Sequence, residues 1–409
     1  MRTSAFSRYV VGGCVAAAML AGCGGSQPPI GAPSALKNGE MDGAQYSVLH
    51  AFKAKANGYA PQALIAANGR LYGLTFSGGY TKAQQCGSGC GVLFSMAIDG
   101  STYKVLHRFL GGADGAGPFW IFAKGSNLYG VTYEGGGGAC KTQWFTGCGT
   151  AFHIGLDGSN YSVLHRFHNP ETNGSFPCGL AAFDGELYGT TFGGGKHRHG
   201  ILLRMDVSGA DFSIVHSFAA NGDGASPNPE LTVLKGALFG TTMHGGTLGY
   251  DDGTIFSVNA QSLYKNVYNA IFGMPYAGVI PVQDRLFGTT VTGGLPDCPQ
   301  GCGTVYRLAP NGDGFKILRK FNGPPDAVGP QGNLIVSGGM IYGVSTEGGA
   351  YGEGTVFRIS SSGSDYEIVY SFKGKREGGS LGIIALAGKY LYGTAAGGKD
   401  GIIWRLALY

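Results

Sequence analysis

Trp144 and Phe145 lie between Cys140 and Cys148, and their side chains have the clearest binding chemistry in the sequence. A disulfide around them would hold both rings on the surface in a loop of nine residues. Aromatic rings offer a sugar or a peptide a large contact area at low entropic cost. We therefore take both as candidate ligand-binding residues, with packing inside their own loop as the alternative.

Three histidines and an arginine could support a second kind of binding, either of a metal ion or of an anionic ligand. His197-Arg198-His199 share one glycine-rich segment, and His244 lies in the corresponding segment of the next repeat. A metal site would need a further ligand, which Asp251 or Asp252 could supply. Exposed loop histidines are common, so we expect no metal at these histidines and keep Arg198 as a candidate contact for an anionic ligand.

Four other histidines share one position in a repeated apolar run, as in Tyr103–Phe109 and Tyr161–Phe167. They are His50, His107, His165 and His216. Equivalent positions in a repeat have a common structural role, so these histidines predict packing rather than a single active site. By the same reasoning, the threonines after each Leu-Tyr-Gly should hydrogen-bond within a sheet, and Asp-Gly-Ser segments such as Asp99–Ser101 should form turns.

Acidic residues form no recognisable catalytic pattern, and neither a Ser-His-Asp arrangement nor a phosphate-cradling loop is present. Five of them fall in loops that could meet at one end of the molecule, namely Glu134, Glu347, Glu353, Asp297 and Asp400. Their spacing defines no acid–base pair. We therefore favour a protein that is not an enzyme and that needs no cofactor.

The cysteines indicate an oxidising compartment. Cys90, Cys148 and Cys302 each precede a glycine that opens the same kind of apolar run, and each has a second cysteine just upstream. We therefore expect disulfides 86–90, 140–148 and 298–302, because these spacings differ from those of zinc sites. Cys178 is left over and is expected to be a buried thiol.

The N-terminus resembles a bacterial export signal. Arg2 and Arg8 precede the apolar stretch Tyr9–Leu20, which is too short to span a bilayer comfortably. The sequence Leu20-Ala21-Gly22-Cys23 resembles the lipobox, in which the cysteine is lipidated. We therefore expect a signal peptide over 1–22, a flexible tether over 23–44, and an outer-membrane lipoprotein of the cell envelope, either periplasmic or surface-exposed.

Composition narrows the fold class. Glycine accounts for 77 of 409 residues, which excludes a mostly helical protein, and 43% hydrophobic residues argue against disorder. Charged residues make up only 13% of the chain, the net charge is +4, and no basic stripe is present. The sequence therefore gives no indication of nucleic-acid binding.

The high glycine content is explained by seven sequence repeats. Leu71-Tyr72-Gly73 recurs six times with small changes, at spacings of 48 to 59 residues, the last copy being Leu391-Tyr392-Gly393. This period is that of propeller blades rather than of helical solenoids. Each repeat contains four short apolar or alternating runs that are typical of half-buried strands.

The two ends of the chain predict how the repeats are arranged. The last repeat stops after its third run, at Gly401–Leu406, whereas an unpaired fourth run, Tyr46–Phe52, precedes the first repeat. Joining the two completes a seventh sheet and protects the sheet edges. We therefore predict an all-β, seven-bladed propeller of four-stranded antiparallel blades, closed by its N-terminal strand.

The combination of Leu-Tyr-Gly-Thr-Thr, Gly-Gly-Gly, Gly-Thr-Val-Phe and Val-Leu-His-x-Phe resembles the GloVer (Gloeo/Verruco) tandem repeat of exported bacterial proteins. The resemblance covers 45–409 and departs from the pattern at Val267–Phe272. It implies export and a propeller, but no particular activity. The repeat units are expected at about 53–109, 110–167, 168–218, 219–272, 273–321, 322–372, and 373–409 with 45–52.

In such a blade, the loop between strands two and three and the crossover to the next blade emerge on the same face. Variable loops on a rigid scaffold are where binding residues concentrate. We therefore expect a monomeric, lipid-anchored propeller that binds a protein or a glycan through this face. The alternatives are a polysaccharide-active lyase or hydrolase with its site at the channel mouth, and a structural component of the envelope.

Overall fold

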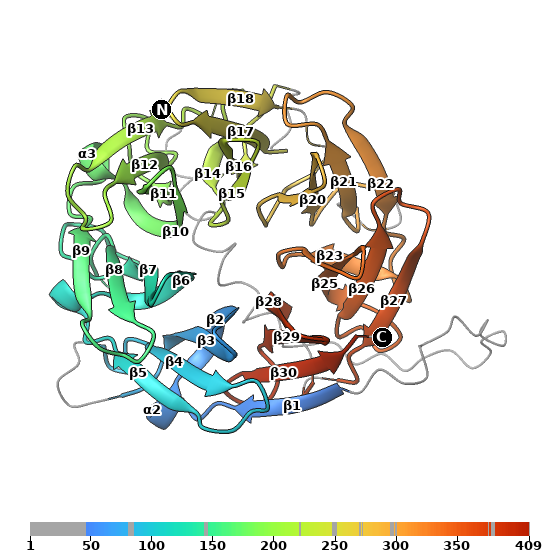
Figure 1. Ribbon diagram of the computed structural model, residues 1–409, viewed down its shortest axis with the longest axis horizontal. Helices are drawn as coiled ribbons and strands as arrows, with labels where there is room; N and C mark the ends of the chain where they lie inside the picture. The colour runs from blue at the N-terminus through green and yellow to red at the C-terminus, as the bar shows by residue number, and fades with distance from the viewer. Residues whose placement is uncertain are drawn as a thin grey trace, which may run out of the picture.

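The computed structural model describes residues 46–408 except 81–85, 143–145, 221, 248–251, 270, 272, 295–297, 299–300, 375 and 378–380. The chain forms a seven-bladed β-propeller, with the seven sheets arranged in a ring around a central axis (Figure 1). This confirms the predicted fold class. The expected signal peptide, the tether and Cys23 lie outside the described residues.

The first three blades each contain four strands in sequence order. Blade 1 contains β2 (Tyr59–Ala67), β3 (Arg70–Ser77), β4 (Val92–Ala97) and β5 (Lys104–Arg108). Blade 2 contains β6 (Ala116–Lys124), β7 (Asn127–Glu134), β8 (Thr150–Gly155) and β9 (Ser162–Arg166). Blade 3 contains β10 (Ser175–Phe183), β11 (Glu186–Gly193), β12 (Ile201–Met205) and β13 (Ser213–Ser217).

In blades 4 and 6 the inner strand is divided into two short strands that both pair with strand two. Blade 4 contains β14 (Ala225–Pro227), β15 (Thr232–Leu234), β16 (Ala237–His244), β17 (Thr254–Asn259) and β18 (Tyr264–Tyr268). Blade 5 contains β19 (Ile280–Val282), β20 (Arg285–Thr290), β21 (Thr304–Leu308) and β22 (Lys316–Lys320). Blade 6 contains β23 (Ala327–Pro330), β24 (Ile335–Ser337), β25 (Met340–Gly348), β26 (Thr355–Ser360) and β27 (Tyr366–Ser371).

Blade 7 is built from both ends of the described chain. Its sheet has the order β1-β30-β29-β28, with β1 (Tyr46–Ala51) beside β28 (Leu381–Ala387), β29 (Tyr390–Ala395) and β30 (Ile402–Ala407). Tyr46 pairs with Leu406 and Ala51 with Ile402. The ring is therefore closed by the N-terminal strand, as predicted. The helical segments α2 (Ala54–Asn57), η3 (Gly112–Asp114) and α3 (Pro170–Asn173) are each a single turn or less.

The glycine of each Leu-Tyr-Gly lies opposite a large side chain on strand three. Gly73 pairs with Phe94, Gly288 with Tyr306 and Gly393 with Trp404. A Cβ atom on Gly393 would lie 2.1 Å from Cζ2 of Trp404, whose side chain is fully buried. The repeated glycine thus provides the space in which strand three places a large core residue, which is aromatic in every blade except blade 3, where it is Leu203.

The glycine that opens strand three has a different role, because it lies against the next blade. Gly149 has a φ of +103°, and a Cβ atom there would lie 2.3 Å from Cδ of Pro177 in blade 3. Glycines 91, 200, 253, 303 and 401 repeat this contact with the proline of the blade that follows. Both the positive φ and the close approach require glycine.

The repeated threonines hydrogen-bond within the sheet, as predicted. Thr132 Oγ1 donates to the carbonyl oxygen of Glu134 and accepts the main-chain N–H of Thr150 on the adjacent strand. Thr75, Thr191 and Thr242 make the same two contacts. The expected Asp-Gly-Ser turns are also confirmed, since Asp99 Oδ1 accepts bonds from both the main-chain N–H and the Oγ–H of Ser101.

The four equivalent histidines pack between blades, which confirms their structural interpretation. Each stacks on an aromatic ring at the start of strand four in the next blade, with His107 and Tyr161 centroids 3.7 Å apart. Burial lowers the pKa of His165 to about 4, so this ring is neutral at neutral pH. In the remaining blades Tyr268, Arg319 and Tyr370 occupy the position and contact Phe315, Tyr366 and Tyr46. The seven contacts form a complete cycle around the ring.

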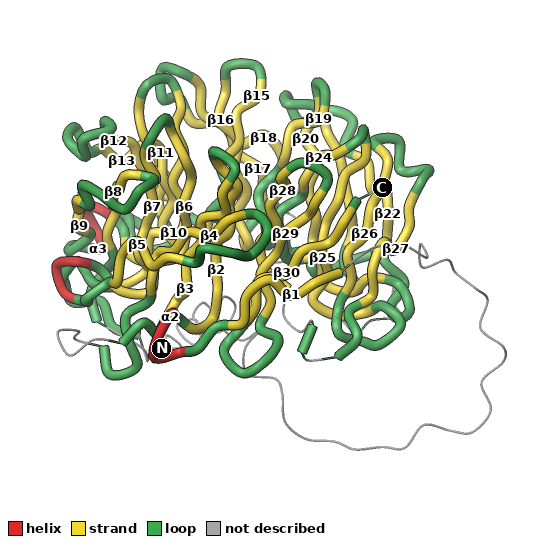
Figure 2. Tube along the Cα trace, turned by 60° about the horizontal axis from the view of Figure 1, so that its bottom comes forward, coloured by secondary structure: helices red, strands yellow, loops and turns green. Residues whose placement is uncertain are grey.

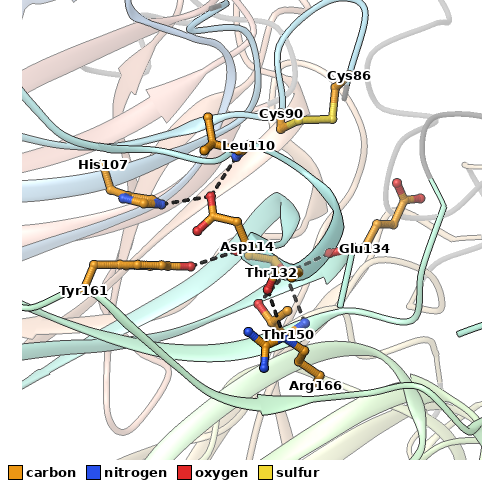
Figure 3. A network of polar contacts seen from close by, with 11 residues as sticks. Cys86, Cys90, His107, Leu110, Asp114, Thr132, Glu134, Thr150, Tyr161 and Arg166 are labelled. Atoms are coloured by element: carbon orange, nitrogen blue, oxygen red, sulfur yellow. Dashed lines mark hydrogen bonds and ion pairs between the residues drawn. A yellow bond between two sulfur atoms is a disulfide. The ribbon is translucent and has the colours of Figure 1, made fainter. Parts of the chain in front are cut away.

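An acidic side chain reinforces several of these contacts. Asp114 accepts the main-chain N–H of Leu110, and its Oδ2 lies 3.2 Å from Nε2 of His107 (Figure 3). The Tyr161 hydroxyl of blade 2 donates to the carbonyl oxygen of Asp114. Asp223 makes the corresponding contacts with His216 and Tyr264. The crossover after strand four is thereby tied to both blades that it connects.

Candidate functional site

The two faces of the propeller differ in the length of their connections. In every blade the strand one to strand two connection has two residues, as at 68–69 and 184–185. Asn68 and Gly69 both have positive φ, which is the geometry of tight hairpins. We call this the turn face. The opposite, or loop, face carries the connections between strands two and three and the short helices α2 and α3 (Figure 2).

Disulfides close the three longest of these loop-face connections. The connections at 78–91, 135–149 and 291–303 contain 14, 15 and 13 residues, and the other four contain six to nine. The bridges are Cys86–Cys90, Cys140–Cys148 and Cys298–Cys302, as predicted. Cys178 is buried and outside any disulfide, with Sγ 3.3 Å from the carbonyl oxygen of Pro227. Each covalent link therefore closes part of a long connection into a smaller ring and reduces the number of conformations open to that part.

The candidate aromatic residues Trp144 and Phe145 lie outside the described residues, although the disulfide that encloses them in the sequence is present. On the flanking segment, Lys141 forms an isolated β-bridge with Thr146. Their proposed role in ligand binding thus continues to depend on the sequence alone.

The other candidate ligand contacts differ in their exposure and partners. Arg198 is exposed, and its guanidinium forms an ion pair with Glu171 at 3.2 Å. His197 is exposed beside it, whereas His199 is half-buried and burial lowers its pKa. His244 is half-buried at the end of β16 in the next blade. Asp251 lies outside the described residues, within which no group of three or more His, Cys, Asp or Glu side chains could hold a metal ion.

Exposed tyrosines on the loop face were not identified from the sequence. Tyr59 begins β2 and is 40% exposed, and Tyr80 and Tyr351 lie in the loops of blades 1 and 6 with exposures of 48% and 53%. Each of the two loop tyrosines follows a Gly-Gly pair closely, as Gly79-Tyr80 and Gly349-Ala350-Tyr351. The preceding glycine pair is the feature of the sequence that could have predicted this exposure, because a side chain next to a glycine-rich turn has few neighbours to pack against.

The acidic candidates differ sharply in their surroundings. Glu134 is fully buried at the end of β7, and burial raises its pKa to about 7, partly offset by a hydrogen bond from Thr142. Its carboxylate extends away from the Asp114 contacts (Figure 3), and Oε2 is buried without a hydrogen-bond partner. Within the described part of the chain, Glu134 is therefore the one of the five predicted carboxylates whose pKa is raised by burial.

The remaining carboxylates do not gather around Glu134. Glu347 is exposed and Glu353 is half-buried. Asp400 Oδ2 accepts the main-chain N–H of Ala54, which ties the last blade to α2. Asp297 lies outside the described residues. Among the described residues, burial and the Thr142 hydrogen bond account for the pKa of Glu134, and no neighbouring carboxylate contributes to it.

The comparisons with known proteins bear on fold and family. The model of the Gloeobacter/Verrucomicrobia repeat matches residues 37–250, 137–295 and 250–408. No curated protein matches the sequence. None of the helices in the described residues is long and apolar enough to cross a membrane.

Two solved structures share the fold at low sequence identity. A puromycin-hydrolysing peptidase of Mycobacterium tuberculosis aligns with a TM-score of 0.54 and 11% identity over 86% of this chain and 52% of that one. A GH74 enzyme of Niastella koreensis aligns with a TM-score of 0.53 and 12% identity over 88% of this chain and 53% of that one. This chain therefore spans about half the length of these enzymes, and the likeness shows the fold alone.

Proposed function

The chain belongs to the Gloeobacter/Verrucomicrobia repeat family, and from that premise we propose that it is a non-enzymatic binding protein that uses its loop face. The ligand is a protein or a glycan. A lipid on Cys23 holds the propeller at the outer membrane, and the segment 23–44 tethers it. In this proposal the ring is a rigid support, and recognition depends on the loops.

The observation that carries the proposal is that all three disulfides close the three longest loops on one face. A free loop of 13 to 15 residues would lose much conformational entropy on binding, whereas a bridged loop has lost part of it already. The exposed Tyr80 and Tyr351 offer ring surface on the same face. Rings beside stiffened loops suit flat sugar faces and peptide backbones.

A second candidate function is hydrolysis or elimination on a polysaccharide at this face. The observation in its favour is Glu134, a buried carboxylate whose pKa is raised to about 7, which suits a general acid at neutral pH. The peptidase and the GH74 enzyme with the same fold are compatible with this alternative. No neighbouring carboxylate contributes to the raised pKa of Glu134, and the lack of such a partner acid or base among the described residues favours binding over catalysis.

We predict that Trp144→Ala and Tyr80→Ala each weaken binding at least tenfold on a glycan and peptide array, because each removes a stacking ring. Val233→Ala is the matched control, since Val233 is 46% exposed beside the turn face. If Trp144→Ala and Tyr80→Ala both bind the array as the wild type does, the loop-face proposal is contradicted. Release of new reducing ends from a polysaccharide, lost in Glu134→Gln, would favour the enzymatic alternative instead.

The anchor is tested separately. We predict that Cys23→Ser moves the chain from the membrane fraction to the soluble fraction of the envelope, because the thiol that would carry the lipid is absent. The protein should keep its array binding, since the substitution lies outside the propeller. Retention in the membrane fraction would be incompatible with lipid anchoring at Cys23.

A further inference from the structure

A cleft of about 360 Å³ lies on the turn face between blades 1 and 2. Its lining includes Arg70, Tyr72, Ser95, Lys104 and Asp157. The first four residues come from strands two, three and four of blade 1, and Asp157 comes from the turn between strands three and four of blade 2. We call this the blade 1–2 cleft, and it faces away from the loops considered above.

The strand register explains why space is available there. Tyr72 pairs with Ser95, and Ser95 pairs with Lys104, so these three side chains form one row across the sheet. The residue that corresponds to Ser95 is a histidine or an arginine in five other blades, namely His153, Arg204, Arg307, Arg358 and Arg405. A serine in this position is therefore much smaller than the side chain that most blades place there.

Two of these arginines show how the longer side chain is held in place. Arg307 Nη1 donates to the carbonyl oxygen of Ser361 in the turn of the following blade at 2.9 Å. Arg358 Nε lies 2.6 Å from Oε1 of Glu367. In blade 1 the corresponding bridge to the next turn comes from the adjacent strand, where Lys104 Nζ donates to the carbonyl oxygen of Asp157 at 2.9 Å. Beneath that bridge, the short Ser95 leaves the cleft open.

The cations of the cleft have neutral partners. The Arg70 guanidinium donates to Ser95 Oγ and to Thr102 Oγ1, each at 3.4 Å, and to the carbonyl oxygen of Thr102 at 3.2 Å. Among the described residues no carboxylate oxygen lies within 4.0 Å of Arg70 or Lys104. Two cations and the Asp157 carboxylate make the cleft net positive by one charge. This balance suits a monoanion.

We propose that the blade 1–2 cleft binds a sugar acid. Arg70 and Lys104 hold its carboxylate, because a planar guanidinium and an ammonium both recognise that group. Ser95 and the Asn68 amide bond its hydroxyls, and Leu106 and Leu156 contact the ring. The volume is at the small end of ligand sites, so it fits one monosaccharide, either free or at the end of an acidic polysaccharide.

The test is titration calorimetry of the full chain with galacturonate, glucuronate, galactose and inorganic phosphate at physiological salt. We expect at least one uronate to bind at least tenfold more tightly than galactose, which lacks the carboxylate, and than phosphate. An oligouronide that competes with the monosaccharide would identify a polysaccharide end as the source. Absence of uronate binding, or equal binding of galactose or phosphate, would overturn the proposal.

Two variants locate the site. Ser95→Arg places in blade 1 the residue that blades 3, 5, 6 and 7 carry at this position, so it should fill the cleft and abolish uronate binding. Ser257→Arg is the matched control, because Ser257 holds the same position in blade 4. Arg70→Gln should weaken uronate binding at least tenfold. If Ser95→Arg does not fold, Arg70→Gln alone tests whether uronate binds in the blade 1–2 cleft. Uronate affinity that survives both cleft variants would reject the site.

Discussion

Deletion of Tyr46–Phe52 should destroy the cooperative unfolding of the propeller. This segment contains β1, and its removal would leave the edge of β30 unpaired and uncover the aromatic residues behind it. Tyr46 stacks on Tyr370 at a centroid distance of 5.0 Å and lies beside the buried Trp404. Loss of the three large side chains Tyr46, Leu49 and Phe52 alone should cost about 5 kcal/mol or more.

Chemical denaturation and size-exclusion chromatography with light scattering measure this effect. We expect a broad, early transition together with soluble aggregates, because an open sheet edge invites pairing between chains. Val48→Ala on the same strand is the control, since Val48 is 44% exposed and its truncation should change stability by about 0.5 kcal/mol or less. A monomeric deletion variant with the wild-type midpoint would show that ring closure contributes little.

Gly149→Ala should destabilise the propeller by more than about 3 kcal/mol, although it adds a single methyl group. The residue has a φ of +103°, and the new Cβ would lie 2.3 Å from Cδ of Pro177 and 2.5 Å from the carbonyl oxygen of Thr132. Both neighbours are backbone or ring atoms that cannot rotate away. Thermal unfolding followed by circular dichroism should show a midpoint lower by on the order of 5 °C or more.

Gly125→Ala separates the two causes of this loss. Gly125 also has a positive φ, at +60°, but a Cβ atom there would have no neighbour within 4 Å. We expect it to cost about 1 kcal/mol, which is the penalty of the left-handed conformation alone. If the two variants unfold at the same temperature, the close approach of Pro177 adds no cost beyond that of the left-handed conformation.

Ring closure could be predicted from the sequence because it depends on counting. Seven Leu-Tyr-Gly copies, a last repeat without its fourth strand and an unpaired strand at Tyr46–Phe52 admit one economical arrangement. The disulfides could be predicted equally well. The two cysteines of each pair lie within nine residues of chain, and the second is followed directly by the glycine that opens strand three. The four histidines were correctly assigned to packing because they recur at one position of the repeat.

The surface features were harder to predict, because they depend on what surrounds a residue. Nothing in the sequence near Glu134 distinguishes it from the exposed Glu347, since each lies at or next to the end of strand two of a blade and directly precedes a Gly-Gly pair. Burial alone separates them. Ser95 is an unremarkable serine until the strand register shows that other blades place an arginine there. Neither the small residue nor the cleft could be recognised before the sheets were aligned.

The position of the disulfides has a consequence for redox chemistry. Each bridge begins and ends within one connection of one blade, at 86–90, 140–148 and 298–302, so none joins two blades. A thiol reductant would therefore loosen these three loops while the hydrogen-bonded ring stays closed. The ligand binding proposed for the loop face would then depend on the thiol balance of the surroundings, whereas the integrity of the propeller would not.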